Sequence, residues 1–141
     1  MKIVENGRKK MKYCKMTITT AVDGVENSIT RKGEMSLLPA EIRLRYQEEN
    51  AIISINVQGD HAQIQRRGDY DLFLDLQSNS VSQGKIGIGA SLGEVEIFTH
   101  KILYSISKDS LLLSLRYDLI ISGEKQEMKL RLLSRYEGEK V

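Results

Sequence analysis

The chain has 141 residues, of which 40% are hydrophobic and 28% are charged, and its formal net charge is +2. This length and composition suit one soluble globular domain with a substantial core. No apolar run approaches the roughly 20 residues of a membrane-spanning helix, and the single cysteine excludes an internal disulfide.

The first residues are basic. Residues 1–15 contain six lysines and arginines and one glutamate, whereas the other 126 residues contain 15 basic and 18 acidic side chains. No apolar stretch follows this start, so we expect no secretory signal, and a lone thiol then favours the cytoplasm. We predict that residues 1–12 form a basic, flexible arm and that residues 13–137 form the folded domain.

Alternation of apolar and polar side chains runs through most of the chain, and no segment of ten residues keeps a helical period of 3.6. A period of two predicts strands with one face turned to the core. The clearest strand covers residues 111–121. Similar runs cover residues 15–20, 41–47, 53–57, 69–76 and 126–136.

Short turn sequences separate these runs. They are Asp23-Gly24, Lys32-Gly33, Glu49-Asn50, Gly59-Asp60, Arg67-Gly68, Ser78-Asn79, Lys108-Asp109 and Ser122-Gly123. Short connections favour neighbouring strands that are also consecutive in sequence, and closure removes the exposed edges of an open sheet. The expected fold is all-β, a single antiparallel up-and-down barrel of about eight to ten strands.

The alternation changes register once. The apolar positions of residues 95–99 carry odd numbers, and those of residues 102–106 carry even numbers. One residue near His100-Lys101 must be absorbed, so we predict a β-bulge or sharp bend there, which also helps a sheet to curl closed.

Three short motifs carry a family resemblance. They are Ile64-Gln-Arg-Arg-Gly68, Leu92-Gly-Glu-Val-Glu-Ile-Phe-Thr99, and the late pair Leu113-Ser-Leu-Arg-Tyr-Asp-Leu119 and Met128-Lys-Leu-Arg-Leu132. Through them the chain, from about residue 16 to residue 135, resembles the YwiB-like family of uncharacterised bacterial proteins. These are lipocalin-like or calycin-like β-barrels. Leu92 departs from the aromatic residue that the family commonly has there. The resemblance implies a barrel and no particular activity.

No sequence motif indicates an enzyme, a metal site or a cofactor. Gly89-Ala-Ser91-Leu-Gly93 matches the nucleophile elbow of hydrolases, but a strand pattern follows it where that motif needs a helix. The two histidines, His61 and His100, have no second ligand at metal-binding spacing. A pair of glutamates, at 94 and 96, lies on the face opposite Val95 and is expected to face water.

Inward-facing polar side chains give the candidate ligand-binding residues. By parity, Tyr46, Tyr70, Tyr104 and Tyr117 share a face with aliphatic neighbours, and a buried hydroxyl needs a partner. Arg66 is two residues after Ile64, so its side chain falls on the same, inward face of the strand, and it lies just before the end of that strand. Its expected role is to close a barrel end against a loop acid such as Asp69 or backbone carbonyls; the alternative is contact with a ligand.

The leading functional hypothesis is non-catalytic binding of a small apolar or amphipathic molecule in the barrel interior or mouth, because small barrels either fill with side chains or hold one ligand. The alternative is a module that binds protein or nucleic acid through the basic arm or an outer face, with nucleic acid the less favoured partner. The outward basic row of Lys125, Lys129, Arg131 and Arg135 is interpreted as a solvated face.

We predict that residues 1–10 are dispensable for folding, because they lack the period-two pattern. A chain that starts at Met11 is expected to keep the melting temperature of the full chain in thermal denaturation. A loss of several degrees would show that the arm packs against the domain.

Overall fold

In the computed structural model, residues 11–137 form ten antiparallel strands and no helix, so none of these residues forms a helix that could cross a membrane. The all-β prediction is confirmed. The strands are β1 (Lys12–Val22), β2 (Val25–Leu37), β3 (Ile42–Glu48), β4 (Ala51–Gln58), β5 (His61–Gly68), β6 (Asp71–Gln77), β7 (Ser80–Ile88), β8 (Ser91–Ser107), β9 (Ser110–Ile121) and β10 (Glu124–Tyr136).

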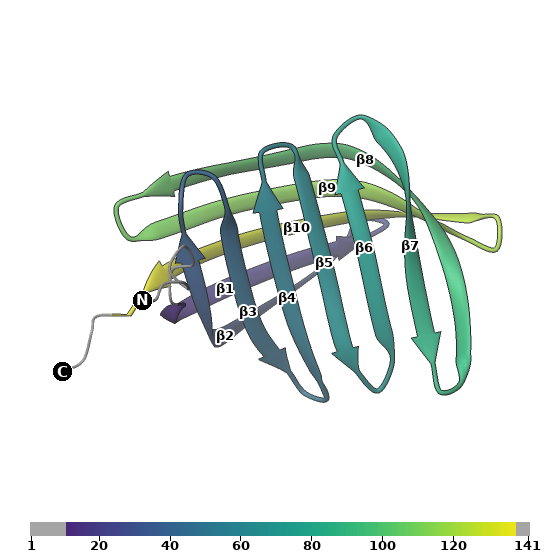
Figure 1. Ribbon diagram of the computed structural model, residues 1–141, viewed down its shortest axis with the longest axis horizontal. Coiled ribbons are helices and arrows are strands. Elements are labelled where there is room, and N and C mark those ends of the chain that lie inside the picture. Colours follow the sequence, from purple (N-terminus) through teal and green to yellow (C-terminus); the bar gives the residue numbers. More distant parts are fainter. Residues whose placement is uncertain (1–10, 138–141) are drawn as a thin grey trace, which may run out of the picture.

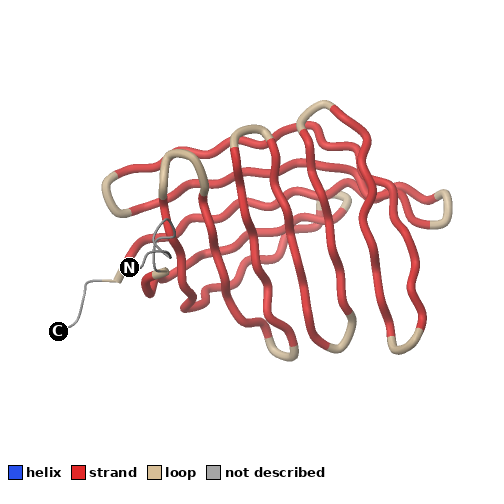
Figure 2. Tube along the Cα trace, viewed as in Figure 1, coloured by secondary structure: helices blue, strands red, loops and turns tan. Residues whose placement is uncertain are grey.

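Each strand pairs with the next strand in sequence, and β1 pairs with β10 to close the barrel. Two-to-four-residue connections join all ten strands, as the tan segments of Figure 2 show. The predicted up-and-down, lipocalin-like barrel is therefore confirmed. The sequence predicts an arm over residues 1–12. Its first ten residues lie outside the described part of the chain, and β1 begins at Lys12.

Two long strands divide the barrel into two halves. β2 pairs with β1 over residues 25–35 and with β3 over residues 33–37, while β8 pairs with β7 over residues 91–99 and with β9 over residues 96–107. Figure 1 shows β3–β7 running steeply across β8, β9, β10 and β1. The barrel is thus flattened into two layers that share β2 and β8 at their corners.

The bend in β8 lies where the sequence predicts it. The pairing with β9 shifts register between Thr99 and Lys101, so His100 is the extra residue of a β-bulge. Thr99 on one side of the bulge and Ile102 on the other both face the interior and are buried. The bulge therefore keeps both parts of β8 facing the core while the strand passes from one layer to the other.

Two of the predicted turns are placed differently in the structure. Lys32-Gly33 is not a turn: β2 continues through it, and a Cβ on Gly33 would lie 2.4 Å from the Arg45 carbonyl oxygen. The glycine allows β2 to approach β3 where it changes partners. Arg67-Gly68 ends β5, and the turn itself is formed by residues 69 and 70.

The interior is filled with side chains. A continuous cluster of buried residues includes side chains from both layers. Its largest fully buried side chains are Met16, Ile18, Met35, Ile42, Leu44, Ile55, Leu74, Leu76, Ile97, Leu111, Leu113 and Leu115. Among the described residues, Thr99 Oγ1 is the buried side-chain oxygen that lacks a hydrogen-bond partner. Thr99 is fully buried, directly beside the bulge.

We predict that Thr99→Val stabilises the protein by about 1 kcal/mol, because a buried hydroxyl without a partner costs free energy that a methyl group does not. Urea unfolding of the two proteins measures the difference. The matched control is Thr17→Val on the exposed outer face of β1, for which we expect no gain. A loss of stability in Thr99→Val would show that the hydroxyl has a partner, such as a molecule bound inside the barrel.

Candidate functional site

The predicted inward tyrosines lie in different environments. Tyr46 and Tyr117 are both 5% exposed and belong to the core cluster, while Tyr104 is half-buried against it. Burial raises the pKa of Tyr117 to about 12, and burial also raises the pKa of Tyr46, where the Glu48 carboxylate adds to the effect. Both phenols are therefore neutral at physiological pH and act as packing groups with one polar end.

The placement of Tyr70 in the interior is wrong. Tyr70 lies in the turn between β5 and β6, outside either strand, and is 37% exposed. Strand alternation does not govern a turn residue, so parity gave no valid direction for its side chain. Its ring instead covers Arg66, whose guanidinium carbon lies 3.8 Å from the ring centre.

Arg66 points inward at the rim of the barrel, as parity predicts, in the cross-strand row that contains Tyr46 and Ile53. Its side chain is 16% exposed. Nη1 donates to the Tyr70 carbonyl oxygen at 2.6 Å, and Nη2 donates to Asp69 Oδ1 at 2.9 Å. The hydrogen bond from Arg66 lowers the pKa of Asp69. Residues of its own turn thus supply two hydrogen-bond partners for the guanidinium.

The five predicted ligand-binding residues do not converge on one space. Arg66 and Tyr70 contact each other at the rim, whereas Tyr104 and Tyr117 come from β8 and β9 in the other layer. Tyr46 and Tyr117 belong to the same buried cluster and are near enough for Tyr117 to contribute to the raised pKa of Tyr46. Ligand binding by this set stays a prediction, and the packing of the interior gives it little room.

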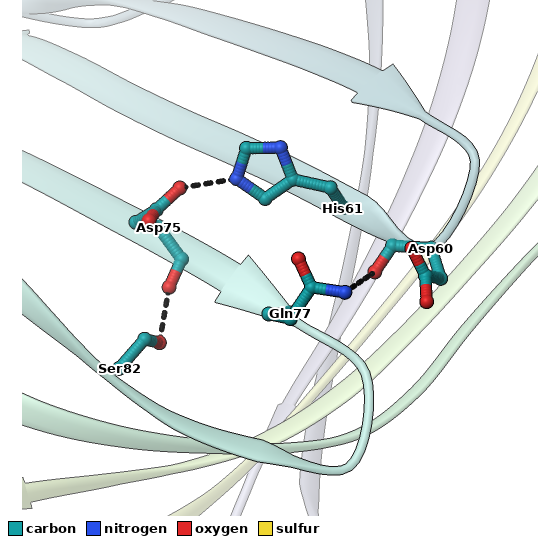
Figure 3. A network of polar contacts seen from close by, with 5 residues as sticks. All are labelled: Asp60, His61, Asp75, Gln77 and Ser82. Carbon is teal, nitrogen blue, oxygen red and sulfur yellow. Dashed lines mark hydrogen bonds and ion pairs between the residues drawn. The ribbon is translucent and has the colours of Figure 1, made fainter.

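Two histidine–aspartate pairs lie on the outside of the barrel. His61 Nε2 is 2.5 Å from Asp75 Oδ1, in a small network in which Gln77 donates to the Asp60 carbonyl and Ser82 donates to the Asp75 carbonyl (Figure 3). The network joins β5, β6 and β7 near their turns. It holds neighbouring strands together and contains no nucleophile placed against a base.

The second pair lies at the bulge. His100 Nε2 is 2.8 Å from Asp118 Oδ2, and Phe98 packs edge-on against the imidazole with ring centres 4.9 Å apart. The extra residue of the bulge is thereby fixed to β9. Asp118 is 8% exposed, so this hydrogen bond also satisfies a nearly buried carboxylate.

The motifs that resemble catalytic sites lack the geometry or reactivity that such sites need. Ser91 is exposed at the start of β8 and a strand follows it, so the geometry of a nucleophile elbow is absent. Cys14 is fully buried, and burial raises the pKa of its thiol, which makes it a poor nucleophile. Within residues 11–137, no three His, Cys, Asp or Glu side chains are grouped as a metal site.

Several lysines and arginines lie on the outer face of the layer formed by β8, β9, β10, β1 and β2. Four cross-strand rows make up this basic face, and each row takes one residue from each strand in that order. The rows are Lys101–Arg116–Lys129–Ala21–Glu26, Leu103–Ser114–Arg131–Thr19–Ser28, Ser105–Leu112–Leu133–Thr17–Thr30 and Ser107–Ser110–Arg135–Lys15–Lys32.

The basic face is strongly asymmetric in charge. Its four rows hold seven lysines and arginines and a single acid, Glu26, which gives a formal charge of +6. Since the whole chain carries +2, the other 121 residues together carry −4. All seven cations are exposed, and within the described part of the chain the only ion pair that any of them makes joins Lys32 to Glu137 at 3.9 Å.

Like charges lie directly opposite one another in the first row. Lys101 pairs with Arg116 across β8 and β9, and Arg116 pairs with Lys129 across β9 and β10. Beside this row is a hollow of about 250 Å³ whose polar lining includes Arg131 and the hydroxyl of Ser114. A second hollow, of about 390 Å³, adjoins it around His100, and its charges are mixed, because Asp118, Glu127 and Glu26 line it together with the cations. In the first hollow the cations outnumber the single acid of the lining, Glu26, and cations together with hydroxyls are the donors that proteins use for phosphate.

Sequence reasoning found only part of the basic face. The outward row of β10 was visible from its period of two, but Lys101, Arg116, Lys15 and Lys32 belong to four other strands. Alternation gives the outward direction of each of these side chains. It does not give their alignment, which depends on the strand order of the closed barrel and on the register shift at the bulge.

Comparisons with known proteins agree with this architecture. The profile of a domain of unknown function (DUF1934) matches residues 14–132. The crystal structure of the ywiB protein from Bacillus subtilis is similar over 95% of this chain and 98% of that chain, with a TM-score of 0.80 and 14% sequence identity. At that identity the similarity concerns the fold alone. No curated protein matches the sequence.

We predict that Arg66→Met raises the pKa of Asp69 towards the ordinary value of 3.8, because the substitution removes the hydrogen bond that lowers it. A lowered pKa in the folded state stabilises the protein above pH 3.8 and stops doing so as the pH falls through the folded pKa. The loss of stability in Arg66→Met should therefore shrink in acid. An NMR titration of the Asp69 carboxyl checks the shift.

The matched control is Arg67→Met, which changes the next arginine on the exposed side of β5 and leaves the Asp69 hydrogen bond in place. An unchanged pKa of Asp69 in Arg66→Met would contradict the assigned contact. If Arg66→Met folds normally but no longer binds an acidic lipid-like probe, that result would support a ligand-contacting role of Arg66.

Proposed function

The chain belongs to the family of the domain of unknown function DUF1934, and we propose that it is a non-catalytic module that binds polyanions through the basic face. The observation that carries the proposal is the row Lys101–Arg116–Lys129, three exposed cations at directly opposed positions of adjacent strands. Like charges opposite one another destabilise a sheet. An arrangement that costs stability in the free protein is accounted for if an anion neutralises it.

The rest of the basic face supports the same function. The two central rows contain no acid, and hydroxyls of serine and threonine surround Arg131 and the three exposed leucines. Hydroxyls and cations together are the usual donors to phosphate oxygens. A face with a formal charge of +6 on a chain with a net charge of +2 also steers polyanions to one side of the molecule.

Binding of a small molecule inside the barrel has less support. The side chains of the core cluster fill the interior, and the guanidinium of Arg66 already has Asp69 and the Tyr70 carbonyl as partners. The hollows that adjoin the basic face lie outside the barrel. We therefore favour an outer-face interaction, and we retain the cytoplasm as its location on the basis of the single buried cysteine.

We predict that the triple substitution Lys101→Gln, Arg116→Gln and Lys129→Gln weakens binding of inorganic polyphosphate and of double-stranded DNA by about a hundredfold at low salt, because three phosphate contacts are lost. The slope of log affinity against log salt should fall in magnitude by about three. Fluorescence anisotropy over a salt series measures both. The melting temperature of this variant should rise, because the opposed charges are gone.

The matched control is Arg43→Gln, Arg67→Gln and Lys85→Gln, which removes the same charge from the other layer. It should keep most of the affinity and the salt slope. Equal losses in the two triple variants would mean that net charge alone controls binding and would contradict a site on the basic face. The absence of polyanion binding in the wild type would contradict the proposed function itself.

A further inference from the structure

Three leucines interrupt the charge of the basic face. Leu103, Leu112 and Leu133 are 56%, 41% and 53% exposed. Leu112 and Leu133 are direct cross-strand partners on β9 and β10, and Leu103 on β8 is diagonal to Leu112. They form one apolar patch on the outside of the barrel.

Cations lie on both sides of this leucine patch. The row that contains Arg116 is on one side, and the row that contains Lys15 and Arg135 is on the other. Because successive rows are two residues apart along a strand, these outer rows are separated by about 20 Å. Arg131 lies within the patch, two residues from Leu133. The face therefore presents an apolar centre with a cationic border.

We infer that the basic face docks onto the surface of an anionic lipid bilayer, an inference that rests on the proposed polyanion binding and names its partner. Lysine and arginine side chains on both borders contact headgroup phosphates, and the leucines enter the boundary between headgroups and acyl chains. Each cation near an anionic membrane surface strengthens the attraction, and the buried leucines add a contribution that salt does not screen.

The composition of the face favours a bilayer over a nucleic acid. None of the 20 positions in the four rows is aromatic, so the face offers no platform on which unpaired bases could stack. A duplex backbone would engage the cations and leave the leucines without an apolar partner. Only a partner that is both anionic and apolar uses every part of this face.

The same composition disfavours a second copy of the chain. An isologous dimer formed through the leucine patch would bring two surfaces of formal charge +6 together. Like-charged surfaces of this kind repel, and Glu26 is the single acid in the rows that could compensate. The face is complementary in charge to anionic lipid headgroups.

The test uses the full chain and flotation with two kinds of vesicle, one of phosphatidylcholine and one of phosphatidylcholine mixed with phosphatidylglycerol. We expect binding to the mixed vesicles and little binding to phosphatidylcholine alone. The variant Leu103→Ser, Leu112→Ser and Leu133→Ser should partition about tenfold or more weakly into mixed vesicles, because its apolar patch is gone. It should keep the affinity of the wild type for inorganic polyphosphate.

The matched control replaces three exposed apolar residues of the other layer, Ile52→Ser, Val81→Ser and Leu92→Ser, which are 50%, 60% and 86% exposed. This variant should bind vesicles as the wild type does. Equal vesicle binding by the two serine variants would overturn the inference. So would a leucine-dependent dimer in analytical ultracentrifugation. Binding of polyphosphate or DNA without binding of mixed vesicles would overturn the bilayer inference and leave the proposed function standing, whereas binding of none of them would overturn both.

Discussion

The pairing of β1 with β10 is the constraint on which the rest of the structure depends. Nine consecutive positions, from Cys14 opposite Tyr136 to Val22 opposite Met128, join the two ends of the sheet. Without this pairing, two long strands would each expose a row of unpaired backbone groups. Closure also holds the inward side chains of β1 and β10 against one core, and it places the outward side chains of these strands side by side on the basic face.

Closure alone would give a rounder barrel with a hollow centre. Ten strands enclose more space than eight, and side chains fill it here because β2 and β8 bend and bring the two layers together. Gly33 permits the bend in β2, and the bulge at His100 permits the bend in β8. The flattened shape explains why a lipocalin-like topology has a packed interior here.

The two layers have different outer faces. The outside of β3–β7 mixes acids with cations, and its paired groups include Arg45 with Glu34 of β2 and His61 with Asp75. The basic face has its cations in rows and its acids at the margin. A sheet stabilised only by itself would favour opposite charges at facing positions. The segregation of charge on one layer is therefore a property of the surface and lowers the stability of the barrel.

The sequence by itself determined the fold class, most turns, the inward residues of most strands and the bulge near His100. All of these follow from the period of two and from local turn chemistry, which act between residues close in the chain. The tertiary structure alone decided that the interior is filled, that Tyr70 covers Arg66 at the rim, and that Lys101, Arg116 and Lys129 form one row. Packing volume, the direction of a turn side chain and alignment across strands arise between residues far apart in the chain, and alternation along one strand carries no information about them.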